Sequence, residues 1–386
     1  MASSLLWILA LLPAAAFASP LAYPLPGEVS PENIKISTPE AGPASHKIQV
    51  QKGGKGRILT TSSDGAVEVE YSSYWFTPAI VGGQNVELTI DTGSADFWVL
   101  GPDLTSEQID GQAIYDPSNS STSQSLANEQ FSIAYGEGGN GVSGPVYTDT
   151  VDIGGATVDQ MPIGSANTYD GLPPGGVKSG FVGLAFQGGN TVRPDKQPTF
   201  MEALQPSLDS PVFTTNFQYN GGTLEFGYID SSLYKGNLTE LQIDNVTTYA
   251  ASWSVEGVHY MSGGADLGTF DLVFDTGGPM TSGPNATVYA YYAQISGAVD
   301  VDGNGKSWNV PCDATLPDLD LQFSSGAVAT IPGASFINGD NGDGTCQCWF
   351  VLENSATRAV IGDPFFTSNF VVFNQAEATI SWAPQA

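Results

Sequence analysis

The sequence is poor in basic residues. Lysine and arginine together number 11 among 386 residues, against 40 aspartate and glutamate residues, and the formal net charge is −29. Nucleic acids and anionic membrane surfaces both attract basic patches, so neither is expected as a partner. The acidic residues are scattered rather than gathered into a tail, and their mutual repulsion declines as carboxylates take up protons. The charge therefore predicts a protein that works in an acidic medium.

Cysteine and histidine are also scarce. The three cysteines are Cys312, Cys346 and Cys348, and the two histidines lie far from them in the sequence. A zinc site is therefore not expected, and no metal or cofactor is predicted. In an oxidising compartment these cysteines favour one disulfide, in which Cys312 bonds either Cys346 or Cys348. Cys346 is the working assignment, and the alternative stays open.

Long apolar runs are absent beyond the N-terminus. There, "LLWILALLPAAAFA" ends in the small-residue pattern Ala16-Phe17-Ala18, which predicts a signal peptide over residues 1–18. The run is short for a membrane span, so we expect a secreted, extracellular protein with no membrane partner. Four Asn-x-Ser/Thr sites are candidate glycosylation positions: Asn119, Asn237, Asn245 and Asn285.

Residues 19–60 are expected to form a propeptide. Five of the eleven basic residues lie in this part of the chain: Lys35, Lys47, Lys52, Lys55 and Arg57. From residue 58 onward there are 6 basic and 37 acidic residues. A basic leader ahead of an acidic body predicts a segment that neutralises an acidic cleft. The alternative is a linker that happens to carry lysines.

The remainder is rich in glycine, with 46 residues in all, and alternates in the way that β-strands do. It also contains an internal repeat. Asp91-Thr-Gly is followed after 92 residues by Gly183 in "GFVGLAF", and Asp275-Thr-Gly after 87 residues by Gly362 in "AVIGDPFF". The repeat predicts two related β lobes, over residues 61–240 and 241–386.

Three other motifs are poor candidates for a site. The G-x-G-x-x-G match at 136–141 lies between two alternating runs, so it predicts a hairpin tip rather than a nucleotide loop. The segment 300–305, "DVDGNG", begins like a calcium loop, but the twelfth position is Pro311 instead of Glu, which favours an acidic turn. His259 is the one histidine beyond the leader, and its strand-like flanks favour a structural or surface role over a serine-protease triad.

The paired Asp-Thr-Gly segments are the strongest candidate. Each ends an apolar strand, and a carboxylate at a buried strand end needs a partner. The simplest partner is the other carboxylate, so Asp91 and Asp275 are expected to meet at a pseudo-twofold axis and share one proton. Gly93 and Gly277 would let backbone amides approach the carboxyl oxygens, while Thr92 and Thr276 would hydrogen-bond across the axis.

With these residues the chain resembles the pepsin-like aspartic endopeptidases, most closely the secreted fungal ones, from about Tyr71 to Ala386. The segments "DTGSADFWV", "YTDTVDIGG", "IDSSLY" and "VIGDPFF" carry the resemblance. It implies an all-β, bilobal pepsin-like fold with a central cleft for an extended polypeptide, and a dyad that shares one proton. It also implies a flap hairpin with Tyr135, Gly136 and Glu137, and Trp98 as the hydrogen-bond partner of Tyr135.

The resemblance implies a secreted acid endopeptidase, made as a zymogen, monomeric and sensitive to pepstatin-type inhibitors. The ionised Asp would activate a water molecule while the protonated one polarises the scissile carbonyl, and the base role is expected mainly at Asp275. Large apolar residues are expected around the cleaved bond. Glu137 stands where fungal relatives often carry Asp, which predicts weaker cleavage after Lys.

One position departs from the family's pattern. Ser94 supplies the hydroxyl that usually follows the first catalytic Asp by three residues, but Gly278 has none, and Pro279 follows it. Loss of that hydrogen bond should raise the proton affinity of the dyad. It also leaves open the alternative of a catalytically impaired homologue that binds peptides or inhibitors.

Overall fold

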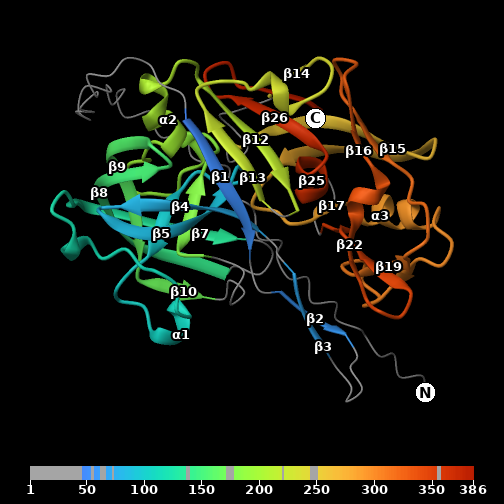
Figure 1. Cartoon of the computed structure of the whole chain (residues 1–386), viewed down its shortest axis with the longest axis horizontal. Coiled ribbons are helices and arrows are strands. Elements are labelled where there is room, and N and C mark those ends of the chain that lie inside the picture. The colour runs from blue at the N-terminus through green and yellow to red at the C-terminus, as the bar shows by residue number, and fades with distance from the viewer. Residues whose placement is uncertain are drawn as a thin grey trace, which may run out of the picture. The chain divides into compact units, whose positions relative to one another are not determined.

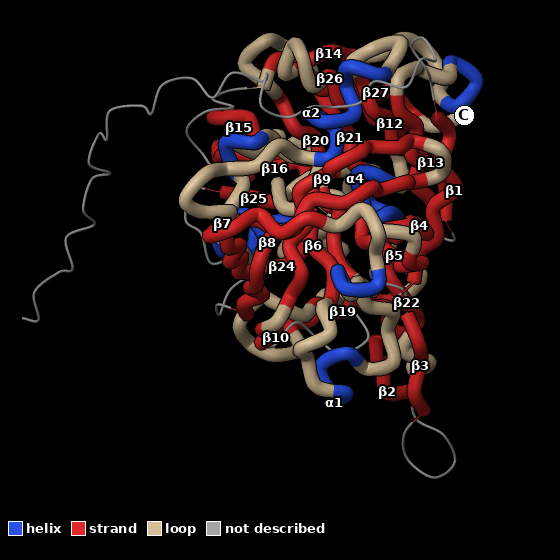
Figure 2. Tube along the Cα trace, turned by 90° about the vertical axis from the view of Figure 1, so that its left-hand side faces the viewer, coloured by secondary structure: helices blue, strands red, loops and turns tan. Residues whose placement is uncertain are grey.

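The structure is a computed structural model that describes residues 46–53, 56–60, 67–71, 74–135, 140–170, 178–219, 221–243, 251–353 and 358–386. The predicted signal peptide and the first part of the predicted propeptide lie outside these residues. In the described part strands dominate and helices are short (Figure 2). The all-β prediction is confirmed.

The largest sheet contains fourteen strands and joins segments from both predicted lobes (Figure 1). In spatial order they are β10 (Thr168–Asp170), β8 (Asn140–Ile153), β9 (Ala156–Ala166), β6 (Phe97–Leu100), β11 (Gly180–Gly183), β5 (Gln84–Asp91), β4 (Tyr74–Val81), β1 (His46–Gly53), β13 (Gly221–Phe226), β12 (Val212–Gln218), β26 (Asn369–Asn374), β27 (Thr379–Pro384) and β14 (Thr239–Gln242), with β7 (Gln124–Tyr135) paired to β8. The lobe boundary at residue 240 falls inside β14 and stays a prediction.

Three smaller sheets complete the described β-structure. The first has the order β21 (Val328–Ile331), β20 (Leu319–Gln322), β15 (Ser254–Ser262), β16 (Ala265–Phe274), β25 (Arg358–Ile361), β17 (Thr281–Gly283) and β24 (Phe350–Leu352). The second has β18 (Val299–Asp300), β19 (Trp308–Pro311), β23 (Thr345–Cys348) and β22 (Ile337–Asp340), and the third has β2 (Gly56–Thr60) and β3 (Val67–Tyr71).

The described α-helices are all short. They are α1 (Ser106–Ile109), α2 (Phe200–Leu204), α3 (Asn285–Tyr292) and α4 (Asp363–Phe366). Thr199 and Glu202 form a capping box that starts α2, because each side chain accepts a hydrogen bond from the other residue's backbone amide. Within the described ranges no helix is both long and apolar enough to cross a membrane.

Strand β1 belongs to the predicted propeptide and is built into the large sheet. Its first half pairs with β13, from His46 opposite Phe226 to Val50 opposite Gly222, and its second half pairs with β4. The Ile48 side chain is 3% exposed and packs in the main core. This part of the leader is therefore a strand of the large sheet, and its role as a propeptide stays a prediction.

The disulfide joins Cys312 to Cys346, with an S–S distance of 2.02 Å. Cys348 is buried and unbonded, and burial raises the pKa of its thiol to about 12. The working assignment to Cys346 is therefore the one the structure contains. The third cysteine stays a protonated thiol over the whole physiological pH range.

The rejected motifs have ordinary structural roles. Strands β7 and β8 pair up to Tyr135 opposite Asn140, and residues 136–139, which carry most of the glycine-rich motif, lie outside the described ranges. Asp300 accepts hydrogen bonds from the amides of Gly303 and Gly305 and closes an acidic turn. His259 is partly exposed and contacts Asp266 at 2.8 Å.

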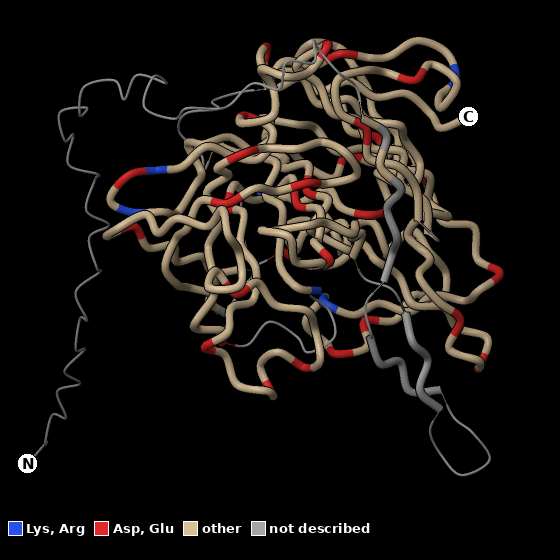
Figure 3. Tube along the Cα trace, turned by 60° about the vertical axis from the view of Figure 1, so that its left-hand side comes forward, with Lys and Arg blue, Asp and Glu red and all other residues tan. Residues whose placement is uncertain are grey.

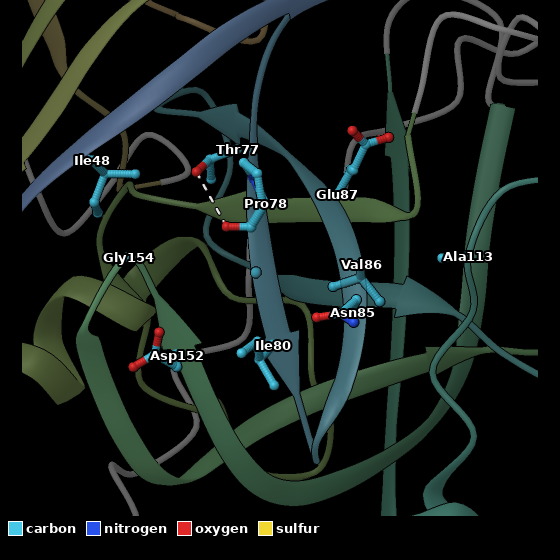
Figure 4. A pocket seen from close by; sticks show the side chains of 11 residues that line it. Ile48, Thr77, Pro78, Ile80, Asn85, Val86, Glu87, Ala113, Asp152 and Gly154 are labelled. Atoms are coloured by element: carbon cyan, nitrogen blue, oxygen red, sulfur yellow. Dashed lines mark hydrogen bonds between the residues drawn. The ribbon is translucent and has the colours of Figure 1, made fainter.

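A groove of about 670 Å³ lies beside β1, β4 and β5 (Figure 4). Its walls include the apolar side chains of Ile48, Ile80 and Val86. Figure 4 shows its two carboxylates, Glu87 and Asp152, at separate ends of the groove. Because acid–base work needs ionisable groups that converge on one point, this groove is a poor candidate for a reaction site.

Candidate active site

Each Asp-Thr-Gly segment follows a strand that is parallel to a neighbouring short strand. In β5 and β11, Asp91 lies opposite Gly183, and in β16 and β25, Phe274 lies opposite Ile361. Backbone hydrogen bonds fix the chain at both acids. Leu184 N donates to Asp91 O at 2.8 Å, and Asp275 N donates to Ile361 O at 3.0 Å. The repeat in the sequence thus corresponds to a repeated pair of parallel strands.

The glycines of the repeat are required by close backbone approach. A Cβ on Gly183 would lie 2.6 Å from the Asp96 nitrogen, and one on Gly362 would lie 2.0 Å from the Gly278 oxygen. Both distances are far below van der Waals contact. Only glycine lets the chain that follows Asp91 or Asp275 pass this close to the short strand of its own half.

The two threonines hydrogen-bond across the pseudo-twofold axis. Thr92 N donates to Thr276 Oγ1 at 3.0 Å, and Thr276 N donates to Thr92 Oγ1 at 2.9 Å. Each hydroxyl then donates to the backbone of the other half, to Phe274 O and Ile90 O, both at 2.9 Å. Both threonines are buried. The four bonds hold the two strand ends in one fixed relation.

This arrangement places the carboxyl groups of Asp91 and Asp275 within hydrogen-bonding reach of each other. The amides of Gly93 and Gly277 donate to them at 2.8 Å in equivalent positions. A Cβ on either glycine would lie 2.5 Å from an oxygen of the opposite carboxyl group. Both glycines are therefore part of the geometry that lets the acids meet.

The hydrogen bonds favour the ionised form at Asp91. Burial raises the pKa of Asp91, while the Ser94 hydroxyl and the Gly93 amide counteract that rise by donating to the carboxylate. Burial also raises the pKa of Asp275 well above its usual value, and the charge of Asp91 raises it further. These contacts favour the ionised form at Asp91 and the protonated form at Asp275. The expectation that Asp275 is mainly the base is not what these donors favour, because the hydroxyl lies on the Asp91 side.

The flap strand β7 ends at Tyr135, close to the dyad. Trp98 Nε1 donates to Tyr135 Oη at 2.7 Å. Tyr135 and Trp98 both stack on Phe181, with ring centroids 4.9 and 5.3 Å apart. The hydrogen bond expected between Trp98 and Tyr135 is therefore present. Gly136 and Glu137 lie outside the described residues.

A cleft of about 680 Å³ contains the dyad. Its walls combine the two carboxyl groups with apolar side chains and with charged groups from the C-terminal part of the chain. The lining includes Ser94, Ile133, Tyr135, Phe181, Thr191, Gly278, Met280, Lys306, Leu352, Glu353, Arg358 and Val360. Apolar walls with a few converging polar groups are the usual composition of a ligand-binding cleft.

Two charged residues, one beside the dyad and one in the cleft wall, were missed in the sequence. Asp96 is 1% exposed and contacts the loop that precedes α2. Arg358 lines the cleft, and its charge opposes the rise in the pKa of Asp275. A charged residue inside the apolar run "ADFWV" was the available signal for Asp96. Arg358 has no local signal, since it reaches the cleft only through the pairing of β25 with β16 and β17.

Three candidate glycosylation sites, Asn119, Asn237 and Asn285, have exposed side chains, and Asn245 lies outside the described residues. Their modification stays a prediction.

The acidic residues are scattered over the described trace, while basic residues are few (Figure 3).

Gly278→Thr is expected to move the basic limb of the pH–rate profile to lower pH, because it acts on Asp275, the acid whose protonated form the contacts above favour. A Cβ on Gly278 would lie 3.5 Å from Asp275 Oδ2, at ordinary contact distance, so a hydroxyl there can donate to the carboxylate and stabilise its ionised form. The measurement is kcat/KM against pH, with Gly278→Ala as the control that adds Cβ without a hydroxyl. A basic limb that stays in place or rises in Gly278→Thr would contradict this expectation.

Comparisons with known proteins bear on this geometry. The family model described as "Eukaryotic aspartyl protease" matches residues 75–385. A "Probable aspartic-type endopeptidase" of Trichophyton verrucosum is 34% identical over 94% of this chain and 85% of the relative. Penicillopepsin-1 of Penicillium janthinellum is 34% identical over 85% of this chain and 99% of its own length. Endothiapepsin of Cryphonectria parasitica is also 34% identical, over 91% of this chain and 84% of the relative.

Proposed function

This chain belongs to the eukaryotic aspartyl protease family, and from that membership we propose that it is a secreted endopeptidase that works in acid through Asp91 and Asp275. The peptide-hydrolase activity follows from the family and from its named relatives. The observation that carries the assignment of residues is the pair of carboxyl groups held across the threonine hydrogen bonds, inside a cleft of the size a peptide needs.

The mechanism follows from the unequal environments of the two acids. The Asp91 carboxylate takes a proton from a water molecule, whose oxygen attacks the scissile carbonyl carbon. Asp275 gives its proton to the carbonyl oxygen, so the tetrahedral intermediate carries two hydroxyl groups and no net charge. The C–N bond then breaks as Asp91 gives its proton to the leaving nitrogen and Asp275 takes a proton from one hydroxyl of the intermediate. The products are a carboxylic acid and an amine, and the dyad again holds one proton, on Asp275. Because the carboxyl groups are coupled, their ionisations belong to the pair.

Hydrolysis of an internally quenched peptide at about pH 4, inhibited by pepstatin, tests the proposed function. The control is the Asp91→Asn protein, expressed and purified identically, which reveals contaminating proteases. The rival proposal, an impaired homologue that only binds peptides, rests on the missing hydroxyl at Gly278. It predicts pepstatin binding without turnover. The direct amide contacts to both carboxyl groups favour turnover.

The leader is proposed to keep the protein inactive until it is acidified. Full-length protein should be inactive at pH 7, because lysines of residues 19–60 can lie among ionised cleft carboxylates. At about pH 4 those carboxylates protonate, and self-cleavage should follow between Arg57 and about Asp64. N-terminal sequencing of the product checks the position, and full-length Asp91→Asn, incubated alone, should stay intact. Full activity at pH 7 without processing would show that the leader does not inhibit.

Cleavage at that position would separate β1 covalently from the enzyme, although β1 lies between β13 and β4 in the sheet. Secretion is proposed from the predicted signal peptide, with the first residue after processing at Ser19. Sequencing of the protein recovered from the culture medium tests the secretion route separately from the activation step.

Substrates are proposed to carry Phe or Leu beside the cleaved bond, in agreement with the apolar side chains of Ile133, Tyr135, Phe181 and Val360 in the cleft. Weaker cleavage after Lys is proposed through Glu137. An unperturbed Glu has a pKa of about 4.3, so this preference should grow as the pH rises through that value. Glu137→Gln should lower the Lys-to-Phe ratio of kcat/KM severalfold at pH 5 and leave the Phe peptide unaffected. If the ratio stays constant, Glu137 takes no part in recognising Lys.

A further inference from the structure

The mechanism leaves one buried acid beside the dyad without a role. Asp96 follows Asp91 by five residues and lies directly before β6, with 1% of its surface exposed. Its carboxyl group accepts a hydrogen bond from Thr191 Oγ1 at 2.9 Å and contacts Thr191 N with both oxygens at 3.2 Å. Asn190 Nδ2 lies 3.5 Å from the same carboxyl group and donates to Ala95 O at 3.0 Å. The loop at 190–191 is thus bound to the segment that carries Ser94 and Trp98.

The same loop is bound on its other side to the flap strand. Ser132 N donates to Thr191 Oγ1 at 3.2 Å. Gln130 and Arg193 exchange two backbone hydrogen bonds, of 3.0 and 2.9 Å. Ser132 precedes the flap residue Tyr135 by three positions on β7. The Thr191 hydroxyl therefore accepts from the flap strand and donates to Asp96 at the same time.

We propose that Asp96 and Thr191 are positioning residues that hold the flap strand β7 at a fixed distance from the catalytic pair. They form a second connection between the flap and the segment after Asp91, independent of the Trp98–Tyr135 hydrogen bond. The two connections reach β7 at Ser132 and Tyr135, so together they fix both the position and the direction of the strand end. The consequence for catalysis rests on the proposed function, because a flap matters only where a peptide lies beneath it.

The protonation state of Asp96 decides which substitution keeps its hydrogen bond with Thr191, and that state depends on burial and on the charges nearby. Arg193 and Lys196 are the nearby cations, and Asp91 and Tyr135 are the other titratable groups that interact with it. Burial raises the pKa of Asp96 to about 6, more than these donors and cations lower it. At about pH 4 the side chain is therefore uncharged. Asparagine is also uncharged and has one acceptor oxygen, so Asp96→Asn should keep the hydrogen bond from Thr191 at this pH. Asp96→Ala removes the acceptor.

Steady-state kinetics of the processed enzyme at about pH 4 test the proposal. Thr191→Val keeps the shape and removes the hydroxyl, and it should lower kcat/KM about tenfold, or ~1.4 kcal/mol, mainly through a higher KM. Thr191→Ser restores the hydroxyl and should recover most of that loss. Asp96→Ala should resemble Thr191→Val, and Asp96→Asn should recover most of the activity. The matched control is Thr330→Val, which removes an exposed Thr–Asp hydrogen bond to Asp320 far along the chain.

Hydrogen–deuterium exchange of the peptide that covers Gln124–Tyr135 tests the connection between Thr191 and the flap strand in a measurement that does not depend on catalytic turnover. Exchange at Ser132 should be about tenfold faster in Thr191→Val than in the wild type, and unchanged in Thr191→Ser and Thr330→Val. This result would support the positioning role even if the wild type proved inactive, in which case only the proposed function would fail. Unchanged exchange in Thr191→Val, or equal kinetic losses in the valine and serine variants, would overturn the proposal.

Discussion

Asp91→Asn and Asp275→Asn should each lower kcat/KM on the order of 10⁴-fold while the protein stays folded. Neither amide can take a proton from water or share one with the remaining carboxyl group. The fold should survive because the threonine hydrogen bonds that join the two halves involve Thr92 and Thr276 and the backbone, not the carboxyl oxygens. The measurement is peptide hydrolysis at about pH 4 by purified, processed protein.

Since these variants cannot process themselves under the proposed mechanism, a trace of wild-type enzyme must remove their leader and then be removed. Asp266→Asn, which changes an exposed carboxylate beside His259, is the control for loss of one charge. Circular dichroism and the melting temperature establish that the variants are folded. Near-wild-type turnover by either pure variant would rule out the two-carboxylate mechanism.

The free energy of unfolding should fall as the pH rises from 4 to 7. Burial raises the pKa values of Asp91, Asp96 and Asp275 in the folded protein. A raised pKa means that the folded state holds the proton more tightly, so the resulting stability is complete below the unfolded value of about 3.9 and is lost as the pH passes the folded value. For Asp96, whose folded pKa is about 6, the loss amounts to about 3 kcal/mol. Repulsion within the acidic body adds to this loss.

Denaturant unfolding of the Asp91→Asn variant measures the free energy of unfolding at each pH without self-digestion of the sample. Between pH 4 and 7 the unfolding free energy should decline, and addition of Asp96→Asn should remove on the order of 3 kcal/mol of the decline. Stability that rises toward pH 7, or an unchanged slope in the double variant, would contradict the assigned pKa shift of Asp96.

The two halves of the site could be predicted from the sequence because each half is a short segment with its own motif. Asp91 and Asp275 stand in the same motif, and the later glycines, Gly183 and Gly362, repeat at similar spacing. The structure explains that spacing: a side chain on either glycine would collide with the backbone that follows the Asp-Thr-Gly aspartate of its own half. A steric requirement of this kind fixes the residue type at one position of each half. The repeat could therefore be recognised from the sequence alone.

Features that depend on which strands become neighbours could not be read in this way. Thr191 stands in "GGNTVRP", which has no periodic pattern, yet it joins Asp96 to Ser132 across long stretches of sequence. The proposed preference of the shared proton for Asp275 depends on the number of donors at each carboxyl group. The position of β1 between β13 and β4 likewise depends on pairing with strands that lie far along the chain. The composition of residues 19–60 indicated only that the leader is basic.

Neutron diffraction of the processed enzyme, crystallised at about pH 4 and exchanged into heavy water, tests the central claim most directly. The account predicts one deuteron shared by the carboxyl groups of Asp91 and Asp275 and located mainly on Asp275, with a water molecule bound to both groups. A deuteron on each carboxyl group, or none on either, would contradict a catalytic pair that shares a single proton.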